Sequence, residues 1–228
     1  MRYPGGKGLT FRNIINIIPE HEVYIETHLG GGAVLRNKRP ARRNIGVDID
    51  PQVVSVWKQR YSHCCELFEA DAISFLKNFK FVGNEVVYAD PPYLSNTRSR
   101  SKIYRFEYCE EDHHQLLQVL QSLPCNVLIS GYPSDLYHQT IGHWNRLTFS
   151  AKTHASVREE NVWFNFELPS RLHDSRYLGR TFRAREVIRR RHATLQRRFA
   201  GFPAEEKHAF VCWIKSNYPE LIDPEVPK

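Results

Sequence analysis

The chain has 228 residues, of which 41% are apolar and 25% charged. This balance excludes a disordered or collagen-like protein and fits one domain with at most a small appendage. The 32 Lys and Arg residues outnumber the 25 Asp and Glu, giving a formal charge of +7, which favours a polyanionic partner such as nucleic acid but also serves solubility alone. No apolar run approaches the ~20 residues that cross a bilayer, and the polar N-terminus has no signal-peptide core. We therefore expect a cytoplasmic protein with no membrane partner.

The cysteine and histidine patterns do not indicate a metal site. The five cysteines are an odd number and form no CxxC pair, which argues against a disulfide framework and against a zinc ribbon. The 11 histidines include no HExxH motif. We expect reduced thiols and no structural or catalytic metal.

Short β-branched runs alternate with helical patterns over the first two-thirds of the chain. Buried strands are predicted at 23–26, 44–49, 66–70, 85–90 and 126–130. Helices are predicted from Pro51 with Asp50 as N-cap, after Asp71, and over the leucine-patterned segment 110–123. This alternation predicts an α/β fold with βαβ units and a mostly parallel sheet.

The last third of the chain changes character. Runs at 144–149 and 161–167 predict two further strands, so close in sequence that we expect an antiparallel pair. Residues 171–198 contain ten arginines and only two acids. Val187, Ile188, Leu195 and Phe199 predict a basic helix there, and a final helix is predicted from about Pro203. We expect a main domain over 1–168 and a basic helical extension over 169–228.

The turn after the first strand is rich in glycine. Glu26 closes that strand, and Gly30, Gly31 and Gly32 follow it. Glycines permit a tight turn and a close approach of the backbone to a ligand, at the carboxyl edge where open α/β sheets bind ligands. The spacing does not match the dinucleotide fingerprint GxGxxG, so a plain turn is the alternative.

Acids follow the next two strands. Asp48 ends the second strand about 20 residues after the glycine turn, where an acid commonly accepts hydrogen bonds from ribose hydroxyls. Helix capping is the alternative, and it suits Asp50 better. Asp71 follows the third strand, where it either meets an adenine amino group or caps the next helix, and the sequence favours neither role.

The fourth strand leads into Asp90-Pro91-Pro92-Tyr93, the most specific feature of the chain. The two prolines fix the backbone and remove two N–H donors, so that carbonyl oxygens and the Asp90 carboxylate supply acceptors alone. Tyr93 offers a flat face for stacking a base. This combination suits a planar exocyclic amine whose nitrogen attacks an electrophile.

Asp-Pro-Pro-Tyr resembles the catalytic motif of the amino-group DNA methyltransferases. The opening Arg2-Tyr3-Pro4-Gly5-Gly6-Lys7 resembles the first motif of the Dam-like, D12-class adenine-N6 methyltransferases. In that family an aromatic residue and a lysine four positions later contact S-adenosylmethionine, and Tyr3 and Lys7 match them. The family's glycine motif matches residues 26–31, its ribose-binding acid matches Asp48 and its catalytic acid matches Asp90.

These matches follow the family's order over residues 2–93, and the segments 130–137 and 163–166 are similar to phage-type adenine methylases. The resemblance implies a Rossmann-like class I methyltransferase sheet with S-adenosylmethionine as cofactor. The residues expected to bind that cofactor are Tyr3, Lys7, Glu26, Gly30, Gly32, Asp48 and Asp71. The expected catalytic residues are Asp90, Pro91, Pro92 and Tyr93.

Two departures from the family pattern matter. Thr27-His28 replaces the usual Pro-Phe, which affects how the cofactor's adenine is packed. Only 18 residues separate Asp71 from Asp90, too few for the recognition domain that the best-known Dam-like enzymes hold there. Recognition must lie elsewhere, in 94–109 or after residue 150.

The segment 94–109 interleaves basic and aromatic residues, which suits phosphates and unstacked bases. Its candidate DNA contacts are Arg98, Arg100, Lys102, Tyr104 and Arg105. A solvated surface loop is the alternative. The arginine-rich stretch 171–198 is a second candidate for backbone contact, with a partnerless basic helix as its alternative.

The sequence thus predicts a site-specific DNA methyltransferase that transfers a methyl group to N6 of a flipped adenine. We expect double-stranded DNA as partner, a monomer or weak dimer, and a bacterial or phage-encoded enzyme of the restriction–modification type. The rival interpretations are a cytosine-N4 or RNA-base methyltransferase, and a non-catalytic nucleic-acid-binding relative. Nothing in mere binding requires Lys7, Asp48 and Asp90 together, which argues against the last.

Overall fold

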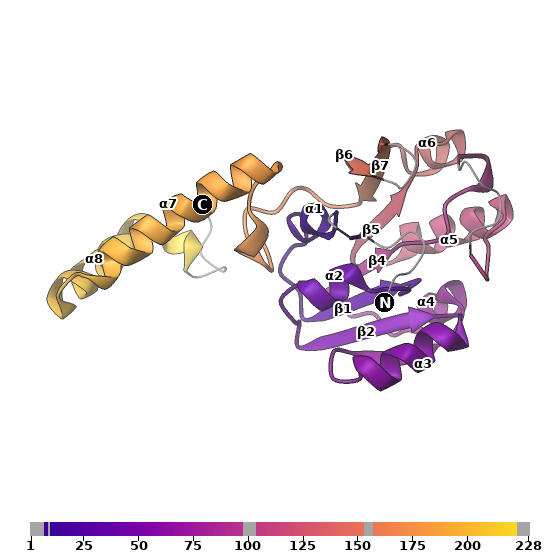
Figure 1. Ribbon diagram of the computed structural model, residues 1–228, viewed down its shortest axis with the longest axis horizontal. Coiled ribbons are helices and arrows are strands. Elements are labelled where there is room, and N and C mark those ends of the chain that lie inside the picture. The colour runs from indigo at the N-terminus through magenta and orange to yellow at the C-terminus, as the bar shows by residue number, and fades with distance from the viewer. Residues whose placement is uncertain (1–6, 9, 98–103, 153–156, 223–228) are drawn as a thin grey trace. The chain divides into compact units, whose positions relative to one another are not determined.

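The computed structural model describes residues 7–8, 10–97, 104–152 and 157–222. Its centre is a seven-stranded sheet in the order β3-β2-β1-β4-β5-β7-β6 (Figure 1). The strands are β1 (Val23–Thr27), β2 (Arg43–Asp48), β3 (Glu66–Glu69), β4 (Glu85–Ala89), β5 (Asn126–Gly131), β6 (Asn145–Lys152) and β7 (Val157–Phe164). The first five are parallel, and β7 runs antiparallel to β5 and to β6. The mostly parallel, Rossmann-like α/β sheet and the antiparallel pair predicted from the sequence are confirmed.

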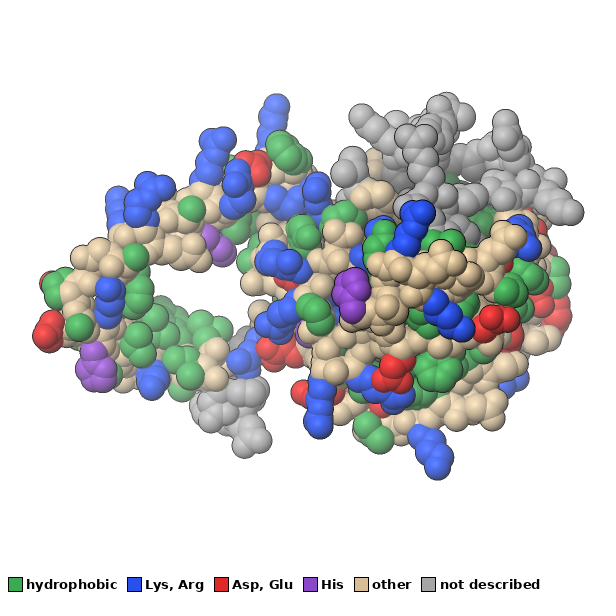
Figure 2. Space-filling model, turned by 60° about the horizontal axis from the view of Figure 1, so that its bottom comes forward, with side chains coloured by type: hydrophobic (Ala, Val, Ile, Leu, Met, Phe, Trp, Pro, Cys, Tyr) green, Lys and Arg blue, Asp and Glu red, His purple; other side chains and the backbone are tan. Residues whose placement is uncertain are grey.

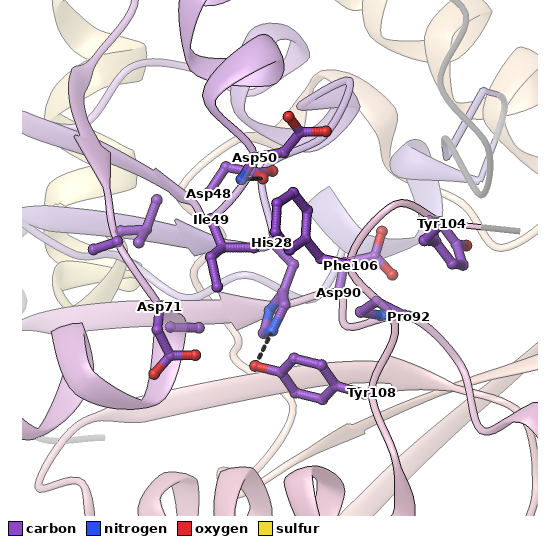
Figure 3. Close-up of a pocket in the computed structure, with 13 residues that line it drawn as sticks. His28, Asp48, Ile49, Asp50, Asp71, Asp90, Pro92, Tyr104, Phe106 and Tyr108 are labelled. Atoms are coloured by element: carbon purple, nitrogen blue, oxygen red, sulfur yellow. Dashed lines mark hydrogen bonds between the residues drawn. The ribbon is translucent and has the colours of Figure 1, made fainter. Parts of the chain in front are cut away.

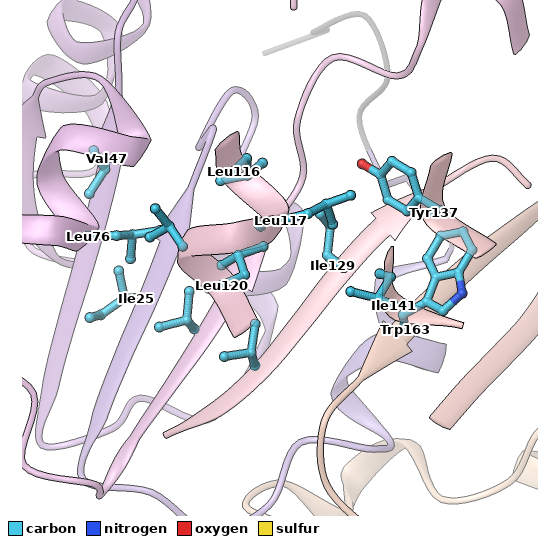
Figure 4. Close-up of a cluster of buried hydrophobic side chains, with 14 of the residues drawn as sticks. Ile25, Val47, Leu76, Leu116, Leu117, Leu120, Ile129, Tyr137, Ile141 and Trp163 are labelled. Carbon is cyan, nitrogen blue, oxygen red and sulfur yellow. The ribbon is translucent and has the colours of Figure 1, made fainter. Parts of the chain in front are cut away.

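Helices cover both faces of this sheet. They are α1 (Phe11–Ile15), α2 (Ala33–Asn37), α3 (Pro51–Arg60), α4 (Ala72–Asn78), α5 (Glu110–Ser122) and α6 (Asp135–Ile141). Successive side chains of a strand point to opposite faces, so that Tyr24 packs with α1, α2 and α3, while Ile25 packs with α4, α5 and α6 (Figure 4). The central strands β1, β2, β4 and β5 are largely buried, which explains their apolar runs. The prediction of a buried strand at 66–70 is wrong in one respect: β3 lies at the edge of the sheet, where only Leu67 is half-buried and its other residues are exposed.

Two helix starts confirm the capping predicted from the sequence. Asp50 accepts a hydrogen bond from the backbone N of Gln52 at 2.8 Å, with Pro51 as the first helical residue of α3. Asp71 accepts one from the backbone N of Ser74 at 2.8 Å and caps α4. The sequence analysis did not predict α1 or α2, because each has only five residues, too short for a helical period to be visible.

The chain divides into two compact units, Met1–Tyr177 and Leu178–Lys228. The stretch before the division belongs with the first unit, because the backbone N of His173 donates to Ile18 O and Asp174 accepts from the backbone N of Arg39 at 2.8 Å. From the sequence we expect the main domain to end at residue 168. The assignment of catalysis to that domain stays a prediction. Among the described residues, no helix combines the length and apolar character needed to cross a membrane.

The second unit consists of two helices, α7 (Phe182–Ala200) and α8 (Ala204–Asn217), followed by a short 3₁₀ turn. The basic helix predicted in this region is confirmed. Neither helix has a buried residue. Ring contacts near the turn join the two helices, with Phe199 and Phe210 centroids 5.7 Å apart and Phe210 stacked on Trp213 at 5.5 Å.

A tight turn joins β1 to α2, and both Gly30 and Gly32 adopt a positive φ in it. Gly32 is the N-cap of α2 and adopts φ +53°, a left-handed conformation that costs other residues about 1–2 kcal/mol. The indole of Trp57 lies directly behind it, so an added Cβ would sit 2.1 Å from Trp57 Cζ2. The same indole donates from Nε1 to Gly30 O at 2.8 Å. Trp57 therefore both holds the turn and forbids a side chain at residue 32.

We predict that Gly32→Ala lowers the free energy of unfolding by about 2–5 kcal/mol, since it adds backbone strain to overpacking against Trp57. Gly83→Ala is the matched control. Gly83 also has a positive φ, but its nearest neighbour would be Pro124 O at 3.6 Å, so only the backbone strain applies. Urea unfolding of both variants measures the difference, and equal losses would contradict the proposed role of Trp57.

Candidate functional site

The candidate site lies where β1, β2, β3 and β4 end, at one edge of the sheet. Parallel neighbours bring these ends together, with Thr27 paired to Val47 and to Ala89. The glycine turn, the acids after β2 and β3, and the Asp90–Tyr93 segment therefore meet at this edge. The topology explains why residues as far apart in sequence as His28 and Tyr108, 80 positions, form one site.

Asp48 organises the glycine turn. Its Oδ2 accepts from Gly30 N at 2.7 Å, and its Oδ1 accepts from Asp50 N at 2.8 Å. Burial raises the pKa of Asp48, and the two backbone donors oppose that rise. The carboxylate thus ties the end of β2 to the turn after β1 and also faces the pocket.

Glu26 is buried behind the glycine turn. Its Oε2 accepts from Leu35 N at 2.8 Å and from the Tyr24 hydroxyl at 3.0 Å, so it anchors α2. Burial raises its pKa to about 8. Neither Glu26, Gly30 nor Gly32 is among the residues that line the pocket, and their roles toward a cofactor stay predictions.

The pocket at this edge combines acids with aromatic rings (Figure 3). Its acids are Asp48, Asp50, Asp71 and Asp90, and its rings are His28, Tyr104, Phe106 and Tyr108. Carboxylates that accept hydrogen bonds, set beside flat apolar rings, suit a ligand that has a planar ring and several donors, such as a nucleoside.

His28 adopts φ +57°, and its Nε2 lies 2.9 Å from the Tyr108 hydroxyl (Figure 3). Burial lowers the pKa of His28 to about 3, so the ring is neutral at physiological pH. The family resemblance raised a question about Thr27-His28. The structure places the His28 ring in the pocket wall, in contact with Tyr108.

Arg105 pairs with one of the acids that line the pocket. Its Nη1 lies 2.9 Å from Asp50 Oδ1, an ion pair that joins the segment 104–108 to the start of α3. Three residues of this segment, Tyr104, Phe106 and Tyr108, line the pocket. Direct DNA contact by Arg105 and Tyr104 stays a prediction, whereas Arg98, Arg100 and Lys102 lie outside the described residues.

A second group, here called the Lys7 cluster, consists of Lys7, Asp90, Tyr93 and Glu160. Lys7 Nζ lies 2.5 Å from Asp90 Oδ1, 2.7 Å from the Tyr93 oxygen and 2.8 Å from Glu160 Oε1. The Tyr93 hydroxyl donates to Glu160 Oε1. Lys7, Tyr93 and Glu160 are each less than 10% exposed. Asp90 belongs both to this cluster and to the pocket wall.

Burial and charge oppose each other in the Lys7 cluster. Burial alone would lower the pKa of Lys7, but the carboxylates of Asp90 and Glu160 outweigh it and hold that pKa well above its usual value. Burial raises the pKa of Asp90 to about 6, with Lys7 pulling it down and Glu160 pushing it up. Near neutral pH Asp90 is therefore an ionised acceptor at the pocket edge.

The structure brings together most of the site residues predicted from the sequence. Asp48, Asp71, Asp90 and Pro92 line the pocket, and Lys7 and Tyr93 meet Asp90. Tyr93 is buried with its hydroxyl bonded, Pro91 is buried, and the stacking and carbonyl roles proposed for them stay predictions. Tyr3 lies outside the described residues.

Sequence analysis gave no role to Glu160. Glu160 lies between the strands predicted at 144–149 and 161–167, and the structure places it inside β7. The partners of a strand residue become visible only when the order of the strands in the sheet is known. Among the residues that the structure describes, no group of three or more His, Cys, Asp or Glu side chains could hold a metal ion.

Comparisons with known proteins agree with part of this description. A family model of the D12 class N6 adenine-specific DNA methyltransferases matches residues 3–70. The match covers the glycine turn and Asp48, under a third of the chain, and ends before Asp90. The match supports methyltransferase activity for this chain. A search of curated proteins finds no match.

Solved structures give distant likenesses. A putative RNA methyltransferase from Pyrococcus horikoshii is 16% identical with a TM-score of 0.49, over 72% of this chain and 87% of its own. Magnesium protoporphyrin IX methyltransferase from Synechocystis, with bound S-adenosylmethionine, is 12% identical with a TM-score of 0.47, over 69% and 78%. A precorrin 8w decarboxylase from Methanobacterium thermoautotrophicum is 11% identical with a TM-score of 0.48, over 72% and 94%. Likenesses this distant carry no argument about the substrate of this chain.

We predict that Lys7→Met lowers the free energy of unfolding by about 3–5 kcal/mol at pH 8, because it leaves two buried carboxylates without a cation. Burial already raises the pKa of Asp90, and the variant removes the cation that lowers it. The loss is therefore largest at high pH and shrinks as the pH falls and a proton replaces the ammonium. Urea unfolding at pH 5.5 and pH 8 measures this. The exposed Lys58→Met is the control, and a pH-independent loss in Lys7→Met would contradict the charge argument.

Proposed function

We propose that this chain is an S-adenosylmethionine-dependent methyltransferase that acts on the N6 amine of adenine in DNA. The observation that carries the proposal is the position of Asp90. Its carboxylate stands at the pocket edge and is held from behind by Lys7. Asp90 directly follows β4 and is itself followed by two prolines. Proline has no backbone N–H, so neither residue can occupy the Asp90 carboxylate as a donor.

The pocket residues fit the cofactor that the proposal requires. Asp48 ends β2, Asp50 follows it, and both line the pocket with Asp71. In this proposal Asp48 and Asp50 accept hydrogen bonds from ribose hydroxyls, and Asp71 accepts one from an adenine amine. Phe106 and Tyr108 supply apolar ring surface for the cofactor's base. Bound S-adenosylmethionine supplies an electrophilic methyl group on a sulfonium.

The protein's own part in the reaction follows from Asp90. An amine that bonds to Asp90 and to the Pro91 carbonyl has its N–H groups fixed and its lone pair free to attack. As the new C–N bond forms, the bond from the methyl group to the sulfonium breaks and S-adenosylhomocysteine would leave. Positive charge develops on the nitrogen, the carboxylate stabilises it, and the nitrogen then releases one proton to solvent. Because N6 is unreachable in a paired base, the adenine leaves the duplex before reaction.

A DNA partner is supported by the arginines of α7. Three exposed residues, Arg183, Arg190 and Arg197, recur every seven positions and so share one face of the helix, about 10 Å apart along its axis. Ile188, Leu195 and Phe199 lie on the opposite face. Figure 2 shows Lys and Arg side chains gathered along this unit. A row of cations at this spacing matches a polyanion better than a single anion.

The test of this function is methyl transfer followed by nucleoside analysis. The purified chain is incubated with methyl-tritiated S-adenosylmethionine and double-stranded DNA, single-stranded DNA or RNA, and the product is hydrolysed. We expect the label in N6-methyladenine from DNA. Label in N4-methylcytosine or in RNA would replace the proposed substrate, and binding without any transfer would favour the non-catalytic alternative.

Asp90→Asn should reduce transfer by about 10²–10³-fold or more, since it removes the anionic acceptor for the amine. The exposed Asp135→Asn is the matched control and should keep its rate. In the unaltered enzyme, kcat/KM should fall below about pH 6, where Asp90 takes up a proton. An acid limb near pH 4 would mean that Asp90 is not the titrating group.

Replacing Arg183, Arg190 and Arg197 together by Ala should weaken DNA binding and reduce the slope of log K against log salt by about 2–3, at ~0.9 per lost phosphate contact. Affinity for S-adenosylmethionine should not change. The control removes equal charge from Arg42, Lys58 and Arg60, all exposed and at the far end of β2 and α3. Fluorescence anisotropy at several salt concentrations measures both slopes. Equal changes of the salt slope in the two triple variants would mean that net charge alone, and not contact by α7, determines DNA binding.

A further inference from the structure

Glu160 is a buried acid whose position does not follow from packing. It lies in β7 and is 4% exposed, with Asn161, Val162 and Trp163 following it as buried strand residues. Its neighbour Glu159 is exposed. The Glu160 side chain reaches residues from two other parts of the chain, Lys7 near the N-terminus and Tyr93 after β4.

Stability alone gives little reason for an acid at this position. Burying a carboxylate costs several kcal/mol of desolvation, and a hydrophobic residue of similar size often serves a core as well or better. Lys7 already has a partner in Asp90, at 2.5 Å. The second carboxylate leaves the Lys7 cluster with two acids and one ammonium.

The extra acid changes what Asp90 can do. Lys7 is shared between two carboxylates, so its charge does not belong to Asp90 alone. The Tyr93 hydroxyl accepts from Lys7 and donates to Glu160, which fixes the tyrosine at the end of the Asp90–Tyr93 segment. Glu160 thereby acts on the charge of one proposed catalytic residue and on the position of another.

We propose that Glu160 is a positioning residue which, through Lys7 and Tyr93, orients the Asp90–Tyr93 segment and keeps Lys7 from fully neutralising the Asp90 carboxylate. This inference rests on the proposed function, because it concerns the acceptor for the reacting amine. No bond to Glu160 forms or breaks during the transfer.

Several titratable groups act on Asp90, and they come from different elements. Lys7 lies on the N-terminal segment, Glu160 on β7, and the remaining groups are Tyr24 and Glu26 on β1, Tyr88 on β4, Tyr93 beyond it and Tyr137 on α6. Lys7 lowers the pKa of Asp90, and Glu160 raises it. Glu160 is therefore the acid in the cluster whose removal should make Asp90 less basic.

The test is Glu160→Gln, which keeps the shape and an oxygen acceptor for the Tyr93 hydroxyl but removes the charge. The pH dependence of kcat/KM is measured with S-adenosylmethionine and double-stranded DNA. We expect the acid midpoint to move down by about one pH unit, the plateau kcat to fall, and the KM for the cofactor to stay unchanged. Glu159→Gln, next to it on the same strand, should change none of these.

A fall in rate without a shift of the acid midpoint would mean a structural role only and would overturn the proposal. The same shift in Glu159→Gln would overturn it as well. If Glu160→Gln does not fold, Tyr93→Phe breaks the same link. The proposal then predicts a lower kcat and an acid midpoint moved upward, because a hydroxyl that favours the Asp90 charge is lost, and an unmoved midpoint contradicts it.

Failure of the proposed function gives a different result. If the unaltered protein transfers no methyl group to any nucleic acid, the link is measured without turnover, by ¹³C NMR titration of the Asp90 carboxyl carbon. Glu160→Gln should lower that midpoint and Glu159→Gln should not. An Asp90 midpoint that Glu160→Gln leaves unmoved overturns the inference whether or not the protein is an enzyme.

Discussion

The buried ammonium of Lys7 is the constraint on which the rest of the site depends. It lies between the carboxylates of Asp90 and Glu160, and none of these three charges is stable in an apolar interior without the others. The contacts join the N-terminal segment, the end of β4 and β7, which are distant in sequence. The antiparallel pairing of β7 with β5 pairs Asn161 with Gly131 and thereby places the preceding residue, Glu160, near the end of β5.

The edge of the sheet divides into two functional halves that share Asp90. On one side, Asp48 and Trp57 hold the glycine turn through backbone groups, and the Arg105–Asp50 pair holds the ring-bearing segment 104–108. On the other side, the Lys7 cluster supplies charge. A pocket rich in acceptors and rings next to one ionised carboxylate is the arrangement that the proposed methyl transfer to an amine would use, with positioning and charge in place of covalent catalysis.

Much of this site could be predicted because its residues end or follow strands that the sequence makes visible. Asp48 and Asp90 come at or after the end of an apolar run, Asp71 follows the exposed edge strand β3, and parallel strands place such ends together. Asp50 and Asp71 as helix caps also follow from local sequence. Glu160 could not be found in this way, since it lies inside a strand and meets Lys7 only through the antiparallel placement of β7 next to β5. Arg105 lies in a segment whose basic and aromatic residues are typical of a DNA contact, yet in the fold it pairs with Asp50. The spacing of residues along the sequence does not reveal such a long-range contact.

The most direct measurement of the account is the titration of Asp90 itself. With aspartate labelled at the side-chain carboxyl carbon and Asp90→Asn used to assign the signal, ¹³C NMR follows its ionisation between pH 3 and pH 9. A midpoint near 6 is expected in the unaltered protein, and a higher one once Lys7→Met has removed the cation that lowers it. A midpoint near the ordinary aspartate value of ~4, unchanged by Lys7→Met, would contradict the claim that the Lys7 cluster sets the charge of the acceptor.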